Sequence, residues 1–368
     1  MVFVRFSYTI CGMAVAAFIG SLLHFSSLQA CTGIKSIAKD GSQVHGRTLE
    51  FGVQVDVSIA VVPREFEFVG KTPEGQGLSY KAKYAAVGAM CFGYPALMDG
   101  LNEKGLAAGT FYFPGFAGYA KITAENQSKA LSPIDFPNWI LTQFASVAEV
   151  KAALSHVVIA PTIAKDWGST PTPFHYIVYD KSGACLVIEP IDGKLQTHDN
   201  PLGVLTNSPT FDWHMNNLRN YINLTVFNAK PIQLRGVELS AFGQGSGMQG
   251  LPGDFAPPSR FVRAAIFSAS AIPVANAEEA VYQIFHLLNQ FDIPLGTARE
   301  KVGDVVYSDM TMITCVRDPQ SLKYYFKTYQ DQNIQVVDLT KFDFNAKAMK
   351  MANTNAKQKV LDVSSQLK

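Results

Sequence analysis

Cys31 is the residue of this sequence whose surroundings most clearly allow catalysis. It follows a segment with the features of a removable leader, so a cut before it would expose its α-amine. An α-amine has a pKa of about 7.7 to 8, so at neutral pH it can take the proton of its own thiol, directly or through a water. Cys31 would then supply both a nucleophile and a general base. Two other interpretations stay open: a buried or disulfide-bonded cysteine, and a lipid-modified cysteine that anchors an exported protein without catalysis.

Residues 1–30 have the organisation of a secretory signal peptide. Arg5 precedes an apolar stretch from Tyr8 to Phe25, and the small or polar residues Ser26 to Ala30 follow it. A basic start, an apolar middle and a small-residue end are typical of a cleaved signal. We therefore expect export to the periplasm or the medium, with an uncleaved membrane anchor as the alternative.

The spacing of the cysteines predicts no metal site. Cys11 would leave with the signal, and Cys31, Cys91, Cys185 and Cys315 would remain, with no CxxC pair among them. Widely spaced cysteines without a neighbouring histidine cluster indicate neither a zinc site nor a compact disulfide framework. The spacing does not decide whether a disulfide joins Cys91, Cys185 or Cys315.

Charge and motifs exclude several classes of partner. Lys and Arg number 31 and Asp and Glu number 30, a net charge of +1, so no strong field favours nucleic acid or an anionic membrane. The GxGxxG match at 245–250 is followed by Pro252, Pro257 and Pro258, which we expect to prevent a phosphate-binding helix from starting there. The seven histidines are scattered, and their spacing supports no catalytic base. We predict no cofactor, no metal, no nucleic-acid partner and, after signal cleavage, no membrane partner.

Several motifs in order resemble one enzyme family. They are Cys31-Thr32-Gly33, the run from Gly46 to Gly52, Asp99 to Leu106, Gly203 to Trp213, Gly250 to Phe255, and Ser259-Arg260-Phe261. Together they resemble the choloylglycine hydrolases, the family of bile salt hydrolases and penicillin V acylases, which are N-terminal-nucleophile amidohydrolases. The resemblance spans nearly the whole mature chain.

The resemblance implies roles for five residues. Cys31 would be the nucleophile, Arg47 would lie beside its thiolate, and Arg260 would complete the catalytic cluster. Glu50 stands where the family usually has an aspartate that holds the α-amine, and Asn207 would bind the oxyanion. These roles suit the side chains, because a guanidinium favours a thiolate and an amide N–H can meet an oxyanion without exchanging protons. Without the resemblance, Arg47 and Glu50 would be interpreted as a surface strand pair.

Tyr112 bears on the substrate. The resemblance places it where bile salt hydrolases tend to have asparagine and penicillin V acylases tyrosine, which favours an acylase. The implied reaction is attack of the thiolate on a linear secondary amide with an apolar acyl group, an oxyanion held by Asn207 and a backbone N–H near Tyr112, and hydrolysis of the thioester. Phenoxyacetyl penicillins, conjugated bile salts and N-acyl homoserine lactones all stay possible. An acyl pocket or plain core would account for the aromatic residues Phe51, Phe92, Tyr94, Phe111 and Phe113.

The elements that must position these residues alternate between strand and helix patterns. Apolar alternation and turn residues predict strands at 31–37, 43–49, 55–62, 83–90, 105–113, 175–180, 184–189, 310–316, 322–328 and 334–339. Helical spacing predicts helices at 136–156, 213–224 and 276–291, the last capped by Asn276 with Glu279 three residues later.

Strands, then helices, then strands again predict an α+β fold with antiparallel sheets. The resemblance implies an αββα four-layer sandwich and commonly a homotetramer. We expect one domain over 31–344 and a polar, solvated tail over 345–368.

Overall fold

The computed structural model describes residues 30–52, 55–91, 95–164, 167 and 169–367. The predicted signal segment therefore lies outside the described residues, except for Ala30. Within the described part of the chain, no helix has the length and apolar character needed to cross a membrane.

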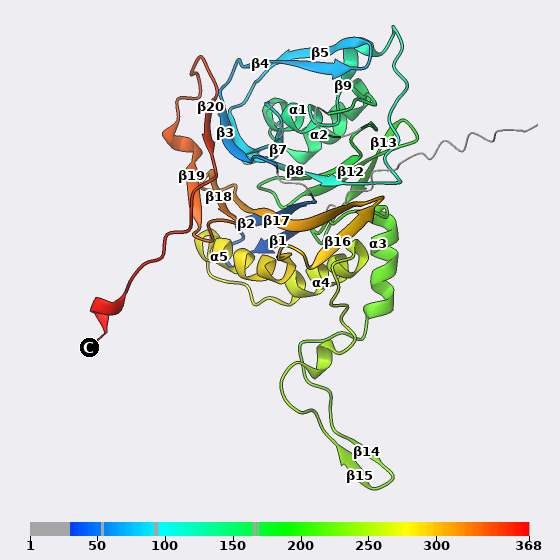
Figure 1. The fold of residues 1–368 in the computed structure, drawn as a ribbon, viewed down its shortest axis with the longest axis vertical. Coiled ribbons are helices and arrows are strands. Elements are labelled where there is room, and N and C mark those ends of the chain that lie inside the picture. Colours follow the sequence, from blue (N-terminus) through cyan, green and yellow to red (C-terminus); the bar gives the residue numbers. More distant parts are fainter. Residues whose placement is uncertain (1–29, 53–54, 92–94, 165–166, 168, 368) are drawn as a thin grey trace, which may run out of the picture.

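Two antiparallel sheets form the centre of the fold (Figure 1). The six-stranded sheet runs β1 (Cys31–Ile37), β2 (Gln43–Phe51), β17 (Val305–Asp318), β18 (Lys323–Thr328) and β19 (Gln335–Asp338), with β16 (Ala298–Val302) also pairing with β17. The eight-stranded sheet runs β13 (Lys194–Asp199), β12 (Cys185–Ile191), β11 (Phe174–Tyr179), β8 (Ala107–Tyr112), β7 (Leu97–Asn102), β6 (Ala86–Met90), β3 (Ser58–Val62) and β20 (Lys350–Asn353).

Helices cover the outer face of each sheet, which gives the predicted αββα sandwich (Figure 1). On the eight-stranded sheet lie α1 (Phe136–Gln143) and α2 (Val147–Ala153); on the six-stranded sheet lie α4 (Pro257–Ser270) and α5 (Ala277–Leu288), beside α3 (Phe211–Asn217). Three short pairs complete the strands: β4 (Glu67–Thr72) with β5 (Gly75–Lys81), β9 (Ala130–Leu131) with β10 (Val158–Ile159), and β14 (Ile232–Leu234) with β15 (Val237–Leu239).

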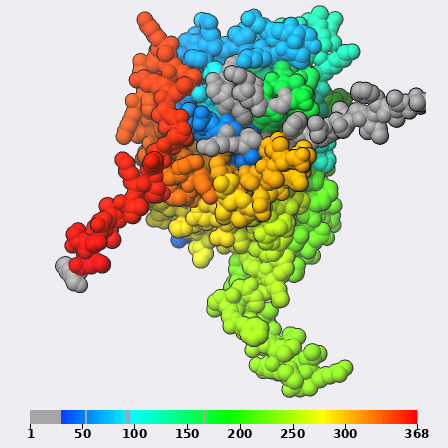
Figure 2. Space-filling model, viewed as in Figure 1, coloured from blue at the N-terminus to red at the C-terminus, as the bar shows by residue number. Residues whose placement is uncertain are grey.

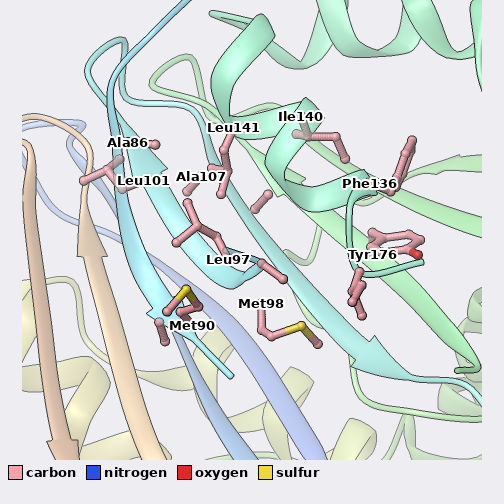
Figure 3. Close-up of a cluster of buried hydrophobic side chains, with 14 of the residues drawn as sticks. Ala86, Met90, Leu97, Met98, Leu101, Ala107, Phe136, Ile140, Leu141 and Tyr176 are labelled. Carbon is pink, nitrogen blue, oxygen red and sulfur yellow. The ribbon is translucent and has the colours of Figure 1, made fainter. Parts of the chain in front are cut away.

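The larger core cluster fills the space between α1 and the eight-stranded sheet and continues to the six-stranded sheet. Figure 3 shows Leu141 of α1 pointing toward the strands that carry Leu101 and Ala107, and Phe136 of α1 beside Tyr176. All five side chains are fully buried. Burial of such side chains stabilises the fold by about 1.5 to 3 kcal/mol each, before the cost of ordering them.

The hairpin of β1 and β2 fixes the position of Cys31, which is the first residue of β1. Asp40 accepts the N–H and hydroxyl of Ser42, and Gly41 takes a left-handed conformation with φ of +85°, as the Asp-Gly turn predicts. The register pairs Cys31 with Leu49, and β17 covers the other edge of β2. Because β2 is paired on both sides and lies between layers, all nine of its residues are buried.

The prediction of a single helix over 136–156 is wrong, because the helix is interrupted between Gln143 and Val147. Asn102 donates to the carbonyls of Leu141 and Phe144, at 2.7 Å each, which ends α1 from outside. Ser146 then caps α2 by accepting the N–H of Glu149 at 3.2 Å.

As expected, no α-helix starts directly after the glycine-rich segment 245–250, although two of the prolines that follow it do enter a helix. Pro257 and Pro258 occupy the first turn of α4, where a missing N–H costs nothing because that group would have no partner in the helix. The helix begins seven residues after the glycine-rich segment, and that segment lies on an exposed loop rather than at the helix start.

The other elements fall close to their predicted positions. Asn276 caps α5 by accepting the N–H of Glu279, as predicted. The helix expected at 213–224 starts at Phe211 and ends as a 3-10 helix over Leu218–Tyr221. The tail differs from the prediction, since β20 adds an edge strand beside β3 and Thr354 is buried against Val57.

Candidate active site

Cys31 lies at the start of β1 with only 5% of its surface exposed. Its nitrogen, joined here to Ala30, donates to Asn207 Oδ1 at 2.9 Å. Burial raises the pKa of the Cys31 thiol, and so does Glu50, whereas Arg47, Arg260 and the Tyr112 backbone N–H lower it. In the uncut chain the thiol is therefore protonated but surrounded by groups that favour a thiolate.

Arg260 connects the first turn of α4 to β1 and to Asn207. Its Nη1 donates to Cys31 O at 2.5 Å and to Thr32 Oγ1 at 2.9 Å, and its Nη2 donates to Asn207 Oδ1 at 2.6 Å. The side chain is fully buried, and its Nε donates to the Phe255 carbonyl at 2.8 Å. A guanidinium with these contacts fixes the Cys31 backbone and the Asn207 amide in one arrangement.

The side-chain amide of Asn207 accepts and donates hydrogen bonds at the same time. Its Oδ1 accepts from Cys31 and Arg260, so its Nδ2 is the nitrogen that donates to the Tyr112 carbonyl at 2.8 Å. The amide has a second N–H, which is the group that the predicted oxyanion role requires. Asn207 thus links β1, α4 and the end of β8.

Arg47 lies in the middle of β2 and is fully buried. Its Nη1 donates to the Thr110 carbonyl at 2.5 Å, and its guanidinium lies 4.2 Å from the centre of the Phe111 ring. Burial lowers the pKa of Arg47, but the negative forms of Cys31 and Asp99 outweigh it and leave the pKa raised. Nη2 has no hydrogen-bond partner among the described residues, which is a costly state for a buried donor and one that suits a ligand.

Glu50 is buried on the same strand but does not contact the Cys31 nitrogen. Its Oε1 accepts from Thr311 Oγ1 at 3.0 Å, and its own N–H donates to the Ala30 carbonyl at 3.0 Å. Burial raises the pKa of Glu50 to about 8, against the lowering effect of Arg260. The predicted contact between this carboxyl and the α-amine is thus absent while Ala30 remains attached, since Asn207 accepts the one N–H of Cys31.

The structure therefore brings the six predicted residues into one buried region. Direct hydrogen bonds join Cys31, Asn207, Arg260 and the Tyr112 backbone, and Arg47 and Glu50 act on the thiol electrostatically. The interpretation of Arg47 and Glu50 as a surface strand pair is wrong, because both are buried.

Aromatic side chains gather on one side of this region. Trp167 lies 6.0 Å from Tyr112 and 5.4 Å from both Phe51 and Phe174, measured between ring centres. Of the five aromatic residues named from the sequence, Phe92 and Tyr94 lie outside the described residues. Phe111 and Phe113 are core residues, packed against Arg47 and against His175 respectively. No sequence pattern pointed to Trp167.

A buried ion pair behind Arg47 was not predicted. Arg317 of β17 donates to Asp99 Oδ2, and the Tyr324 hydroxyl donates to Asp99 Oδ1 at 2.9 Å. Asp99 and Arg317 are both almost completely buried. The available signal was a charged residue inside an apolar strand, as in the run from Met312 to Arg317.

We expect Asp99→Asn to lower the free energy of unfolding by about 3 to 5 kcal/mol, because it leaves the Arg317 guanidinium buried without its counter-charge. Urea unfolding measures this effect. The matched control is Asp199→Asn, which breaks the exposed pair with Lys151 and should change stability far less. Equal unfolding midpoints for the two variants would show that the buried pair is not needed for stability.

The described cysteines are all free thiols, and within the described ranges no three His, Cys, Asp or Glu side chains are arranged to hold a metal ion. Burial raises the pKa of Cys91 to about 12, and it raises the pKa values of Cys185 and Cys315 as well. These three thiols are therefore protonated at neutral pH.

Known proteins share both the sequence and the fold. The family model for linear amide C–N hydrolases of the choloylglycine hydrolase family matches residues 31–352. The bile salt hydrolase/transferase of Clostridium perfringens is 34% identical over 325 residues, covering 88% of this chain and 97% of that protein.

Solved structures agree with these matches. A variant of the conjugated bile acid hydrolase of Clostridium perfringens superposes with a TM-score of 0.81 at 32% identity, covering 91% of this chain and 100% of that chain. The penicillin V acylase of Agrobacterium tumefaciens gives a TM-score of 0.70 at 25% identity, covering 87% and 90%. The chain belongs to the choloylglycine hydrolase family and is a linear amide C–N hydrolase.

Proposed function

We propose that the mature enzyme is a cysteine amidohydrolase that begins at Cys31 and cleaves a linear secondary amide through an acyl thioester on that residue. The observation that carries the proposal is the arrangement around the buried thiol, where Arg260, Asn207 and the Tyr112 backbone converge on one residue at the start of β1. Groups that favour a thiolate and groups that can receive an oxyanion thus lie together.

The reaction follows from these positions. The free α-amine of Cys31 takes the thiol proton, and the thiolate attacks the substrate carbonyl carbon. Asn207 Nδ2 and the Tyr112 backbone N–H donate to the resulting oxyanion. The α-ammonium returns its proton to the leaving amine as the C–N bond breaks, and water, activated by the same amine, then hydrolyses the thioester. The residues present supply every proton transfer.

Removal of Ala30 would give Glu50 its role. Cleavage converts the Cys31 amide into an amine with additional N–H groups and vacates the space beside Glu50 that the Ala30 carbonyl occupies. A carboxyl with a pKa of about 8 would ionise more readily next to an ammonium group. Glu50 would then orient the amine in place of the aspartate usual in the family.

We propose that residues 1–30 direct export and are removed, which places the enzyme in the periplasm or the medium. The sequence pattern supports this proposal, and so does the need for a free amine. The burial of Cys31 opposes the lipoprotein alternative, because a diacylglyceryl group on Sγ would have to occupy the interior of the site.

The substrate we propose has an apolar, preferably aromatic, acyl group. The cluster of Phe51, Tyr112, Trp167 and Phe174 beside the thiol supports this class. Penicillin V, glycocholate and a long-chain acyl homoserine lactone, compared for kcat/KM on one enzyme preparation, test the choice. We expect penicillin V to be the best of the three. A preference for glycocholate by about two orders of magnitude or more, equivalent to some 3 kcal/mol, would make the inference from Tyr112 wrong.

We also propose that the enzyme is a homo-oligomer, with a tetramer as the form that the family resemblance implies. Residues 222–250, which include β14 and β15, project from the body as an arm (Figures 1 and 2). Seven of its apolar side chains are more than half exposed: Ile222, Val226, Phe227, Ile232, Leu234, Val237 and Phe242. A two-stranded hairpin with this surface needs a covering partner, and a second copy is the partner always present.

Light scattering after size-exclusion chromatography tests this assembly. The variant with Ile232→Asp, Leu234→Asp and Val237→Asp should elute as a single chain, whereas the wild type should be a multimer. Val360→Asp, at an equally exposed apolar position outside the arm, is the control and should keep the wild-type mass. A monomeric wild type, or an arm variant with unchanged mass, would contradict the proposed role of the arm.

A further inference from the structure

A second buried polar cluster lies directly behind Asn207. Glu189 of β12 and His175 of β11 are completely buried, and His175 Nδ1 lies 3.1 Å from Glu189 Oε1. His214 of α3 is also completely buried. The reaction described above uses none of these side chains. Burying a carboxylate and two imidazoles costs free energy, so their presence here suggests a function.

The cluster holds the backbone of the segment that carries Asn207. His175 Nε2 lies 3.1 Å from the Thr206 carbonyl, and His214 Nε2 donates to the Asn207 carbonyl at 2.8 Å. Glu189 Oε1 also accepts the Phe211 N–H at 3.0 Å, at the start of α3. The segment is therefore fixed at two successive carbonyls and again four residues later.

The acceptors determine the protons on His175. A carbonyl can only accept, so Nε2 carries a proton, and Nδ1 faces a carboxylate. Burial raises the pKa of Glu189, but the bonds from His175, His198 and the Phe211 N–H lower it to about 2. Glu189 is then ionised at neutral pH, and its Oε1 faces His175 Nδ1. The Phe113 ring stacks on the imidazole, with ring centres 4.2 Å apart and planes 4° apart.

We infer that His175 and Glu189 are positioning residues of the hydrolase, which hold the Thr206–Asn207 backbone so that the Asn207 side chain stays between Cys31, Arg260 and Tyr112. The inference rests on the proposed catalytic role of Asn207. Asn207 Oδ1 and Nδ2 contact three separate elements, so a small shift of its backbone would disturb all of these contacts together.

Three variants separate positioning from packing. His175→Phe keeps the stack on Phe113 and removes both ring nitrogens, and it should lower kcat by about ten- to a hundredfold with KM changed less than about threefold. His175→Gln places an amide donor near the Thr206 carbonyl and should recover kcat to within about threefold of the wild type. His45→Phe is the control: His45 is a buried histidine stacked on Tyr179, and in the described part of the chain its two ring nitrogens have no hydrogen-bond partner, so kcat should stay within about twofold.

A double-mutant comparison tests whether His175 affects kcat through Asn207. In an Asn207→Ala background, His175→Phe should cause less than about a threefold further loss, because the residue that it positions is already gone. An equal loss in both backgrounds would overturn the inference, as would a His175→Phe enzyme with wild-type kcat or a His175→Gln enzyme as slow as His175→Phe. Should His175→Phe fail to fold, Glu189→Gln replaces it with the same expected loss of kcat.

Hydrogen exchange tests the positioning role of His175 without a substrate. Amides of residues 204–212 should exchange faster in His175→Phe than in the wild type, and exchange in α5 should not change. A wild type that hydrolyses no amide would defeat the proposed function, whereas unchanged exchange over 204–212 would defeat this inference alone.

Discussion

Replacing Cys31 with alanine is expected to lower kcat/KM for amide hydrolysis by about 10⁴-fold or more, since loss of a catalytic nucleophile removes the covalent route altogether. The fold should survive, because the substitution removes only one sulfur atom from a buried position. The measurement is kcat/KM on the best substrate of the panel, with circular dichroism to confirm the folded state.

Cys185→Ala is the matched control for this result. Cys185 is as deeply buried as Cys31 and also begins a strand, and burial raises the pKa of both thiols, but neither Arg260 nor Asn207 contacts Cys185. Its replacement removes the same sulfur atom from the interior, so kcat/KM should stay within about threefold of the wild type. Substantial hydrolysis by a folded Cys31→Ala enzyme would contradict the thioester mechanism.

Arg260→Met is expected to give the second largest loss, about 10² to 10³ in kcat/KM. The methionine fills much of the same volume but cannot donate to Cys31 O, Thr32 Oγ1 or Asn207 Oδ1. Glu50 would also lose the cation that lowers its pKa, so its carboxyl would be more strongly protonated. Because those contacts orient reacting groups, the loss should fall mainly on kcat.

Arg263→Met, one turn further along α4, separates catalysis from stability. Arg263 donates to the carbonyls of Pro252 and Asp254 at 2.7 Å each and lies over the Phe291 ring, but it contacts none of the six predicted site residues. We expect a measurable fall in the unfolding midpoint with kcat within about threefold of the wild type. If the two variants had the same kcat, Arg260 would have only a structural role.

Much of the fold could be predicted because local signals determine it. The Asp40-Gly41 turn, the Asn276 cap and the antiparallel pairing of the neighbouring strands β11 and β12 depend on a few residues each, and the structure has these features where expected. Where the structure differs from the predicted elements, contacts between residues distant in the sequence are the cause. Asn102, some forty residues upstream, ends α1, and β20 finds its place only because β3 offers an open edge.

The candidate site was predicted through motifs rather than through geometry. Cys31 and Arg260 are separated by 229 positions, and Asp99 and Arg317 by 218, so no spacing rule could pair them. Periodicity also could not show that Arg47 and Glu50 are buried, because that depends on β17 pairing with β2 from the far end of the chain. The contacts of His175 and Glu189 with the Asn207 segment arise in the same way, where separate strands meet.

The mass of the enzyme recovered from an exporting host, measured before and after a rapid acid quench with substrate, tests the central claim most directly. The account predicts a chain that begins at Cys31 with a free amine, and an added acyl mass that maps to Cys31 after quenching. A fully active enzyme that still carries residues before Cys31, or an acyl group attached at another residue, would contradict it.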